Sequence, residues 1–212
     1  LIKPANLEQK RDLQGKYEKK EIREQCITWI QKHTEKNMSN KKEPAAVPGP
    51  LSDGFRRSDM LNIIVLFGET IAACALAKKW KLRECAQIIA RKNVKALATE
   101  YDPKISRGDD TLNVGCELVA IALQDMLPSV FDSGTEFMLD LFSEDFCGKM
   151  NSSDIESALI KVVPTLVDRT GDSNAKIRAA CTRTFRALLA LQHFDNAPLV
   201  KIMLHHGHKV NK

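Results

Sequence analysis

The segment from Arg169 to Arg178, with the sequence RTGDSNAKIR, constrains the fold most, because it ends one amphipathic helix and starts another within a few residues. Apolar residues recur at spacings of three and four on both sides of it, which is the pattern of helices with one buried face. They are Ile155, Leu159, Val162, Val163 and Leu166 before the turn, and Ile177, Cys181, Thr184, Leu188 and Leu191 after it. Two helices joined by so short a turn lie antiparallel, so this segment predicts a helical hairpin.

The residues of this turn also suit its ends. Gly171 fits the left-handed position that follows a helix, since glycine adopts a positive φ without strain. The polar residues 172–174 are good acceptors for the free N–H groups of the next helix. Lys176 and Arg178 place two cations in the first turn of that helix, where the positive end of the helix dipole disfavours them. They are therefore expected to be either tolerated surface residues or residues that meet an acidic partner.

Two more helical hairpins are expected upstream of this turn. The first covers residues 59–77 and 82–98 and is broken by the polar stretch at 78–81. The β-branched run at 63–67 suits a strand as well, but the apolar stripe continues through Leu76 and no alternating partner strand exists. A helix is therefore the better prediction for this run.

The second hairpin follows a polar connector and has its turn near residue 130. Its first helix is expected to end at Pro128, because proline breaks a helix interior. Its second helix is expected to open at Ser133, since Glu136 three residues later would complete a capping box. Ser153 and Glu156 predict another capping box, at the start of the helix that precedes the tight turn.

Hairpin turns near residues 80, 130 and 171 are spaced by roughly 40 to 50 residues, which is the period of two-helix HEAT-type repeats. A further helix, from Asn196 to Gly207, begins the next unit. We therefore predict an all-α chain with an α-solenoid of HEAT-type helical hairpins over residues 58–212. A compact, irregular helical bundle is the alternative.

Residues 1–57 are expected to form a separate N-terminal part. A charged helix over 7–36, with a narrow apolar face, would dock on the domain or on another helix, and 37–57 reads as a linker with Pro and Gly. Residues 1–48 hold 11 Lys and Arg against 7 Asp and Glu, whereas the remainder holds 21 against 20. The domain is thus nearly neutral, which argues against nucleic acid as its main partner.

The composition fits a globular domain, because hydrophobic residues make up 43% of the chain and suffice for a core. The apolar run at 63–67 is too short to span a membrane, and the chain opens without a signal peptide. We therefore expect an intracellular protein of the cytoplasm and cytoskeleton with no membrane partner. Six scattered cysteines without a C-x-x-C pair are expected to be buried free thiols.

No enzyme is expected, because the chain lacks a phosphate-binding loop, an H-E-x-x-H pair, a nucleophile elbow and a Gly-rich dinucleotide turn. No cofactor is expected either. His205, His206 and His208 lie near a helix end, but adjacent histidines point to different sides of a helix, and no acid or cysteine accompanies them. They are expected to complement the helix dipole rather than to bind a metal.

Two turn motifs resemble the TOG domain family, whose members bind tubulin. They are KWKLRE at 79–84 and TGDSNAKIR at 170–178. The segments at 1–9, 17–21 and 67–69 look similar to one member in particular, a protein of ciliary tips and centrioles. The resemblance covers most of the chain, and the two turn motifs are its specific part.

The resemblance implies a paddle-like solenoid whose turns line one edge and bind the αβ-tubulin heterodimer. Trp80 would press an apolar surface onto tubulin, Lys81 and Arg83 would be the basic positions beside it, and Lys176 with Arg178 would pair with tubulin carboxylates. Asp172, Ser173 and Asn174 would offer hydrogen bonds to tubulin. The full set of assigned residues is Trp80, Lys81, Arg83, Asp172, Ser173, Asn174, Lys176 and Arg178. Other ciliary-tip or centriolar proteins are implied as partners, and the cilium or flagellum tip, the centriole or the basal body as the location.

The chain departs from the family pattern in three ways. Cys85 stands where related sequences are acidic, and the middle turn at 128–132 has no basic residue. The chain also holds about three and a half repeats, so we expect it to be part of a longer TOG domain.

Three classes of function therefore remain. The cationic turns and Trp80 favour a tubulin-binding module that regulates microtubule growth. Burial of those residues would favour a HEAT-type scaffold that binds another protein or peptide. A deep pocket with convergent titratable groups would favour an unrecognised helical enzyme.

Overall fold

A computed structural model of the chain describes residues 21–29, 31–32, 60–99, 108–148, 150–191 and 195–210. Every regular element in these ranges is a helix. The labelled elements are α2 (Leu61–Phe67), α3 (Glu69–Ala75), α4 (Trp80–Thr99), α5 (Gly108–Leu123), α6 (Pro128–Leu141), α7 (Glu144–Cys147), α8 (Ser152–Asp168), the 3₁₀ turn η2 (Arg169–Gly171), α9 (Ala175–Leu189) and α10 (Ala197–Val210). The predicted linker at 37–57 and most of the predicted helix at 7–36 lie outside the described residues.

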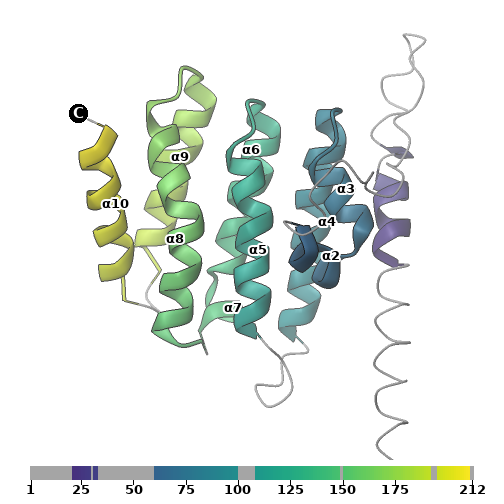
Figure 1. Ribbon diagram of the computed structural model, residues 1–212, viewed down its shortest axis with the longest axis horizontal. Helices are drawn as coiled ribbons and strands as arrows, with labels where there is room; N and C mark the ends of the chain where they lie inside the picture. Colours follow the sequence, from purple (N-terminus) through teal and green to yellow (C-terminus); the bar gives the residue numbers. More distant parts are fainter. Residues whose placement is uncertain are drawn as a thin grey trace, which may run out of the picture.

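The helices stand side by side in two rows (Figure 1). One row runs from α2 and α3 through α5 and α8 to α10, and the other runs from α4 through α6 to α9. Extensive contacts join each element to its neighbours in the row or to its hairpin partner, as in α3 with α4 and α5 with α6. The first and third hairpins do not share a common centre. The predicted α-solenoid of HEAT-type hairpins is therefore confirmed, and the irregular bundle is wrong.

A single apolar core runs through all the hairpins. Its largest buried side chains include Phe67 and Phe137, whose rings meet edge to face with centroids 6.3 Å apart. Residues 21–29 belong to this core, because Cys26 is fully buried against the thiols of Cys74 and Cys85. The apolar face predicted for the N-terminal helix thus packs on the first hairpin.

The first hairpin differs from its prediction at one glycine. Residues 61–67 are helical, as predicted, but Gly68 has φ 85° and divides the expected helix into α2 and α3. Glycine adopts this left-handed region without the steric cost that a side chain brings. A break at Gly68 lets the two short helices turn around the core instead of forming one straight rod.

The middle hairpin turns earlier than predicted. α5 ends at Leu123 and α6 already begins at Pro128, so the turn lies at 124–127 and the expected start at Ser133 is wrong. Proline is favoured in the first helical turn, since its φ is fixed near the helical value and its missing N–H needs no acceptor there. The Ser133 hydroxyl instead donates to the carbonyl of Ser129 within the helix.

The third hairpin corrects two smaller predictions. α8 begins at Ser152 after Asn151, and Ser153 lies inside its first turn, so the capping box expected at Ser153 is wrong. The left-handed conformation expected for Gly171 is also wrong, because a 3₁₀ turn at Arg169–Gly171 ends the helix instead. The cap expected for α9 is confirmed at Asn174, whose Oδ1 accepts the backbone N–H of Lys176 at 3.0 Å.

Ion pairs cross both junctions between hairpins, and in those among the described residues the carboxylate comes from the middle hairpin. Lys161 of α8 reaches Glu117 of α5 at 2.8 Å, and Arg183 of α9 reaches Asp132 of α6 at 2.8 Å. Arg91 of α4 pairs with both Glu136 and Asp140 of α6. These pairs help to set the register of neighbouring hairpins.

A tight contact between α5 and α6 at Gly134 gives a stability prediction. A Cβ added at Gly134 would lie 2.6 Å from Cβ of Ala122, with the clash between two helices that are fixed in the core. Gly134→Ala should therefore lower the free energy of unfolding by about 1 to 3 kcal/mol, measured by urea denaturation. Gly171→Ala is the control, because a Cβ there meets nothing within 4 Å. Equal effects of the two variants would contradict the close approach.

Candidate protein interface

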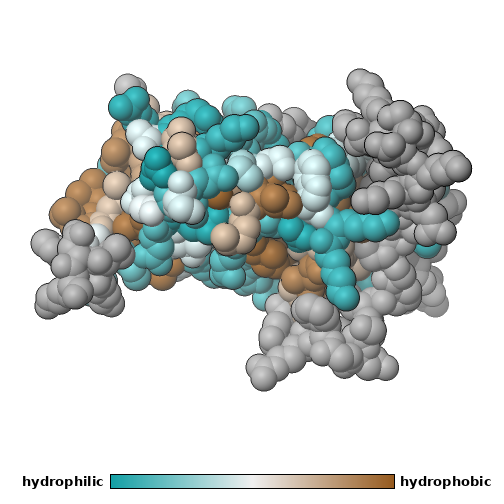
Figure 2. All heavy atoms as spheres, turned by 90° about the horizontal axis from the view of Figure 1, so that it is seen from above, coloured by the Kyte–Doolittle hydropathy of each residue, from teal (hydrophilic) through white to brown (hydrophobic). Residues whose placement is uncertain are grey.

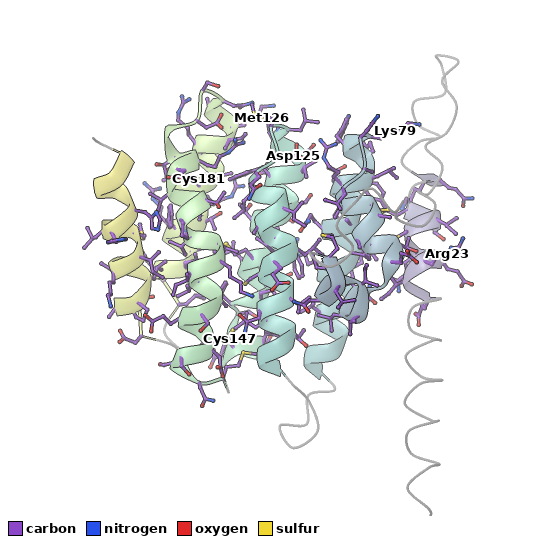
Figure 3. All side chains as sticks on the ribbon, in the orientation of Figure 1. Arg23, Lys79, Asp125, Met126, Cys147 and Cys181 are labelled. Atoms are coloured by element: carbon purple, nitrogen blue, oxygen red, sulfur yellow. The ribbon has the colours of Figure 1, made fainter. Side chains whose placement is uncertain are left out.

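The three hairpin turns lie side by side along one edge of the solenoid, the upper one in Figure 1, which we call the turn edge. It consists of residues 76–80, 124–127 and 169–178. Figure 3 shows Lys79 of the first turn and Asp125 and Met126 of the second turn along this same edge. The predicted alignment of the turns along one edge is thus found in the structure.

The first turn presents an aromatic ring with a cation beside it. Trp80 is the first residue of α4 and keeps 37% of its surface exposed. The Lys81 Nζ lies 4.0 Å from the centroid of the Trp80 ring and 6.0 Å from that of Trp29, and it also pairs with Glu84 at 3.1 Å. A cation this close to the face of an aromatic ring is attracted to it. Trp80 is therefore a partly exposed apolar surface with a cation beside it.

Arg83 joins the first turn to the second. Its Nε and Nη2 donate to the two carboxylate oxygens of Asp125, at 2.5 and 3.2 Å. Its Nη1 donates to the carbonyls of Ala77 and Lys78, at 2.8 and 2.9 Å. The Asp125 side chain is only 7% exposed and that of Arg83 22%, so this pair is largely shielded from water.

Arg169 joins the second turn to the third. Its Nη2 donates to the backbone carbonyl of Asp125 at 2.6 Å, and its Nη1 lies 3.1 Å from Asp172 Oδ2. The guanidinium also lies over the Phe131 ring, 5.5 Å from its centroid. Together with Arg83, this residue connects all three turns through one continuous set of polar contacts.

The third turn contains two kinds of residue. Some side chains form hydrogen bonds within the turn, and others are exposed to solvent. Asp172 Oδ1 accepts the N–H of Asn174 at 2.7 Å, so both of these side chains stabilise the turn itself. Arg178 Nη1 donates to the carbonyls of Asp172 and Ser173, while the rest of its side chain is exposed. Ser173 and Lys176 are exposed. Two cations therefore stand at the surface of this turn.

The second turn contributes apolar surface that the sequence reading missed. Met126 is 72% exposed and Leu127 is 37% exposed. Figure 2 views the molecule from above, onto the turn edge, and shows apolar side chains exposed among hydrophilic ones near the middle of this edge. In the sequence both fall in the helix expected to run to Pro128, where Leu127 continues the apolar spacing from Leu123, so no sequence signal indicated their exposure. The turn at 124–127 holds no cation and presents a hydrophobic surface, whereas the residues 128–132 expected to form this turn belong to α6.

The predicted site residues thus fall into two groups. Trp80, Ser173, Lys176 and Arg178 have surface that a partner could reach. Lys81, Arg83, Asp172 and Asn174 make contacts within the chain and are only partly exposed.

Other kinds of site find no support in the part of the chain that the structure describes. No group of three or more His, Cys, Asp and Glu side chains there could hold a metal ion. His205 and His206 meet edge to face, 5.7 Å apart, on α10. None of the described helices is long and apolar enough to cross a membrane. All six cysteines are free and buried, as the sequence predicts.

The chain is similar to known proteins in sequence and in fold. Residues 57–209 match the family model described as "Centrosomal protein CEP104, TOG domain". The chain is 26% identical over 166 residues to the human centrosomal protein of 104 kDa, and 23% identical over 168 residues to that of Rattus norvegicus. These alignments cover 77% and 79% of the chain but only 18% of each relative, so the chain spans less than a fifth of their length.

Solved structures give the same fold. The TOG domain of human Cep104 superimposes with a TM-score of 0.60 at 20% identity, over 78% of this chain and 70% of that one. A second structure, titled CEP104 TOG domain, gives a TM-score of 0.59 at 24% identity, over 69% of this chain and 56% of that one. With the family model matching well over half of its length, the chain belongs to the family of the TOG domain of centrosomal protein CEP104.

Proposed function

We propose that this TOG domain binds the αβ-tubulin heterodimer through its turn edge and so acts as a microtubule-associated module that regulates microtubule growth. The observation that carries the proposal is the composition of that edge. The turn edge presents a partly exposed tryptophan, an exposed methionine and two exposed cations, namely Trp80, Met126, Lys176 and Arg178. Aromatic and Arg anchors dominate the binding energy of protein interfaces, and cations complement an acidic partner.

The location belongs to the same proposal. The curated relatives are named centrosomal proteins, so we place the protein at the centriole or basal body and the cilium tip, with further proteins of these structures as partners. The test of location is fluorescence imaging of the tagged full-length protein against markers for each structure.

Tubulin binding is tested directly by titrating the purified chain into labelled αβ-tubulin and repeating the titration at increasing salt. We expect a saturable complex that weakens as salt rises, because exposed charges are screened. A chain that remains folded but gives no complex at any salt concentration would refute the proposal and favour a scaffold that binds another protein or peptide.

Met126→Glu is expected to weaken tubulin binding by about tenfold or more. It replaces an apolar residue that is 72% exposed with a negative charge, which an acidic tubulin surface repels. Melting temperature should change little, because most of the side chain is exposed to solvent. Ile160→Glu is the matched control, as Ile160 is 55% exposed on α8 and away from the turns. If the two variants bind alike, Met126 is not part of the interface.

A further inference from the structure

We infer that Arg83 and Asp125 are positioning residues, which hold the three turns in register for tubulin, and that Arg83 does not itself contact tubulin. The inference rests on the proposed function and reassigns a residue that the family motif places among the contacts. Arg83 and Asp125 lie 42 positions apart in the sequence and meet at the junction of the first two hairpins.

The donors of Arg83 are already used within the chain. A guanidinium carries five N–H groups, and four of them point at Asp125, Ala77 and Lys78. A tubulin carboxylate would have to compete with a two-pronged contact whose carboxylate is 7% exposed. Charge-assisted pairs of this kind are the strong ones, so Arg83 stays with Asp125.

Asp125 is the residue on which the turns converge. Its carboxylate accepts Arg83 from the first hairpin and also the backbone N–H of Leu127, at 2.9 Å. Its backbone carbonyl accepts Arg169 of the third turn at 2.6 Å. The second turn is thus held by contacts with the first hairpin, with the third turn and within itself. Figure 3 shows Asp125 and Met126 together at the turn edge.

The consequence concerns the exposed methionine. Met126 lies between Asp125 and Leu127, both of which are held by the Asp125 carboxylate. Arg169 Nη1 also lies 3.8 Å from the Met126 sulfur. The Met126 side chain is therefore held in a defined position on the turn edge relative to Trp80 and the third turn. Fixing an interface before binding lowers the entropy that association costs.

A conservative substitution of Arg83 can distinguish a positioning role from direct contact with tubulin. Lysine keeps the charge but is a point donor, which cannot bridge a carboxylate and two carbonyls at once. If Arg83 served as a cation facing tubulin, Arg83→Lys would bind as the parent does. If Arg83 positions the turns, Arg83→Lys should lose affinity nearly as Asp125→Asn does.

The experiment measures tubulin affinity and melting temperature for four variants. We expect Arg83→Lys and Asp125→Asn each to weaken binding by about tenfold. Arg186→Lys is the control for the same charge-preserving change at an exposed arginine of α9 outside the turn edge, and it should bind as the parent does. Asp140→Asn is the control for stability, because it removes one of the two ion pairs of Arg91 between the same two hairpins, far from the turn edge. It should lower the melting temperature and leave affinity unchanged.

Hydrogen exchange on the unbound chain supplies a readout independent of tubulin. Asp125→Asn should speed exchange at Leu127 and Asn174 together, in the second and third turns, while Asp140→Asn should not. Parent-like affinity in Arg83→Lys or Asp125→Asn, or equal loss in Asp140→Asn, would overturn the inference and leave the proposed function standing. If the parent itself fails to bind tubulin, the proposed function fails, and unchanged exchange in Asp125→Asn would overturn the positioning role as well.

Discussion

Replacing Trp80 with alanine and Arg178 with glutamate is expected to weaken tubulin binding by about a hundredfold or more. Truncating an aromatic interface anchor costs about 2 kcal/mol or more of binding free energy. Reversing the Arg178 charge adds repulsion against an acidic surface. Because the two residues lie in different turns of one edge, their effects should combine.

The same double variant should keep its helical content and nearly its melting temperature. Trp80 is 37% exposed and Arg178 is exposed, and substitutions at such positions usually change stability within about 0.5 kcal/mol. The matched control is Val65→Ala with Lys92→Glu, which makes the same kinds of change at exposed positions of α2 and α4. Early melting would make Trp80 a core residue, and full binding would place the tubulin contacts elsewhere.

The helices could be predicted from sequence because each one buries a face, and the spacing of apolar residues records that face directly. Their starts could not always be predicted, because two start signals compete in a short stretch. Pro128 and the pair Ser133 and Glu136 are both valid signals, and the structure follows the proline. Gly68 is a similar case, since a glycine inside an apolar stripe does not reveal whether the helix continues or breaks.

The site could be predicted only in part, because its two kinds of residue leave different traces. Trp80 and Lys176 stand out locally, as an aromatic ring and a cation in turns. Asp125 and Arg169 act through partners that lie 42 and 44 positions away in the sequence. No local pattern encodes such a contact, so the connection between the turns became visible only when the hairpins were stacked.

Raising the pH from about 8.5 toward 11 is expected to lower the free energy of unfolding steeply, because this fold buries protonated thiols. Burial raises the pKa of Cys147 to about 12 and that of Cys181 to about 11, and it raises the pKa of Cys116 as well. Figure 3 places Cys147 and Cys181 well apart on the structure, so they titrate independently.

The sign follows from proton binding. In the unfolded chain a thiol loses its proton near about pH 8.5, whereas the folded chain keeps it up to the raised pKa. Above about pH 8.5 the folded state therefore binds more protons, and each such thiol removes about 1.4 kcal/mol of stability per pH unit until its folded pKa is reached. The contribution of Cys181 should level off near its raised pKa of about 11, one unit before that of Cys147.

Urea denaturation across this pH range, on the parent and on the double variant Cys147→Ala with Cys181→Ala, measures the effect. Tyrosines and lysines also titrate here, but they are common to both proteins and cancel in the comparison. The variant should lose stability less steeply, by about 1.4 kcal/mol per pH unit for each thiol removed. Equal slopes would mean that the two thiols ionise alike in the folded and unfolded chains, and would contradict the raised pKa of both buried groups.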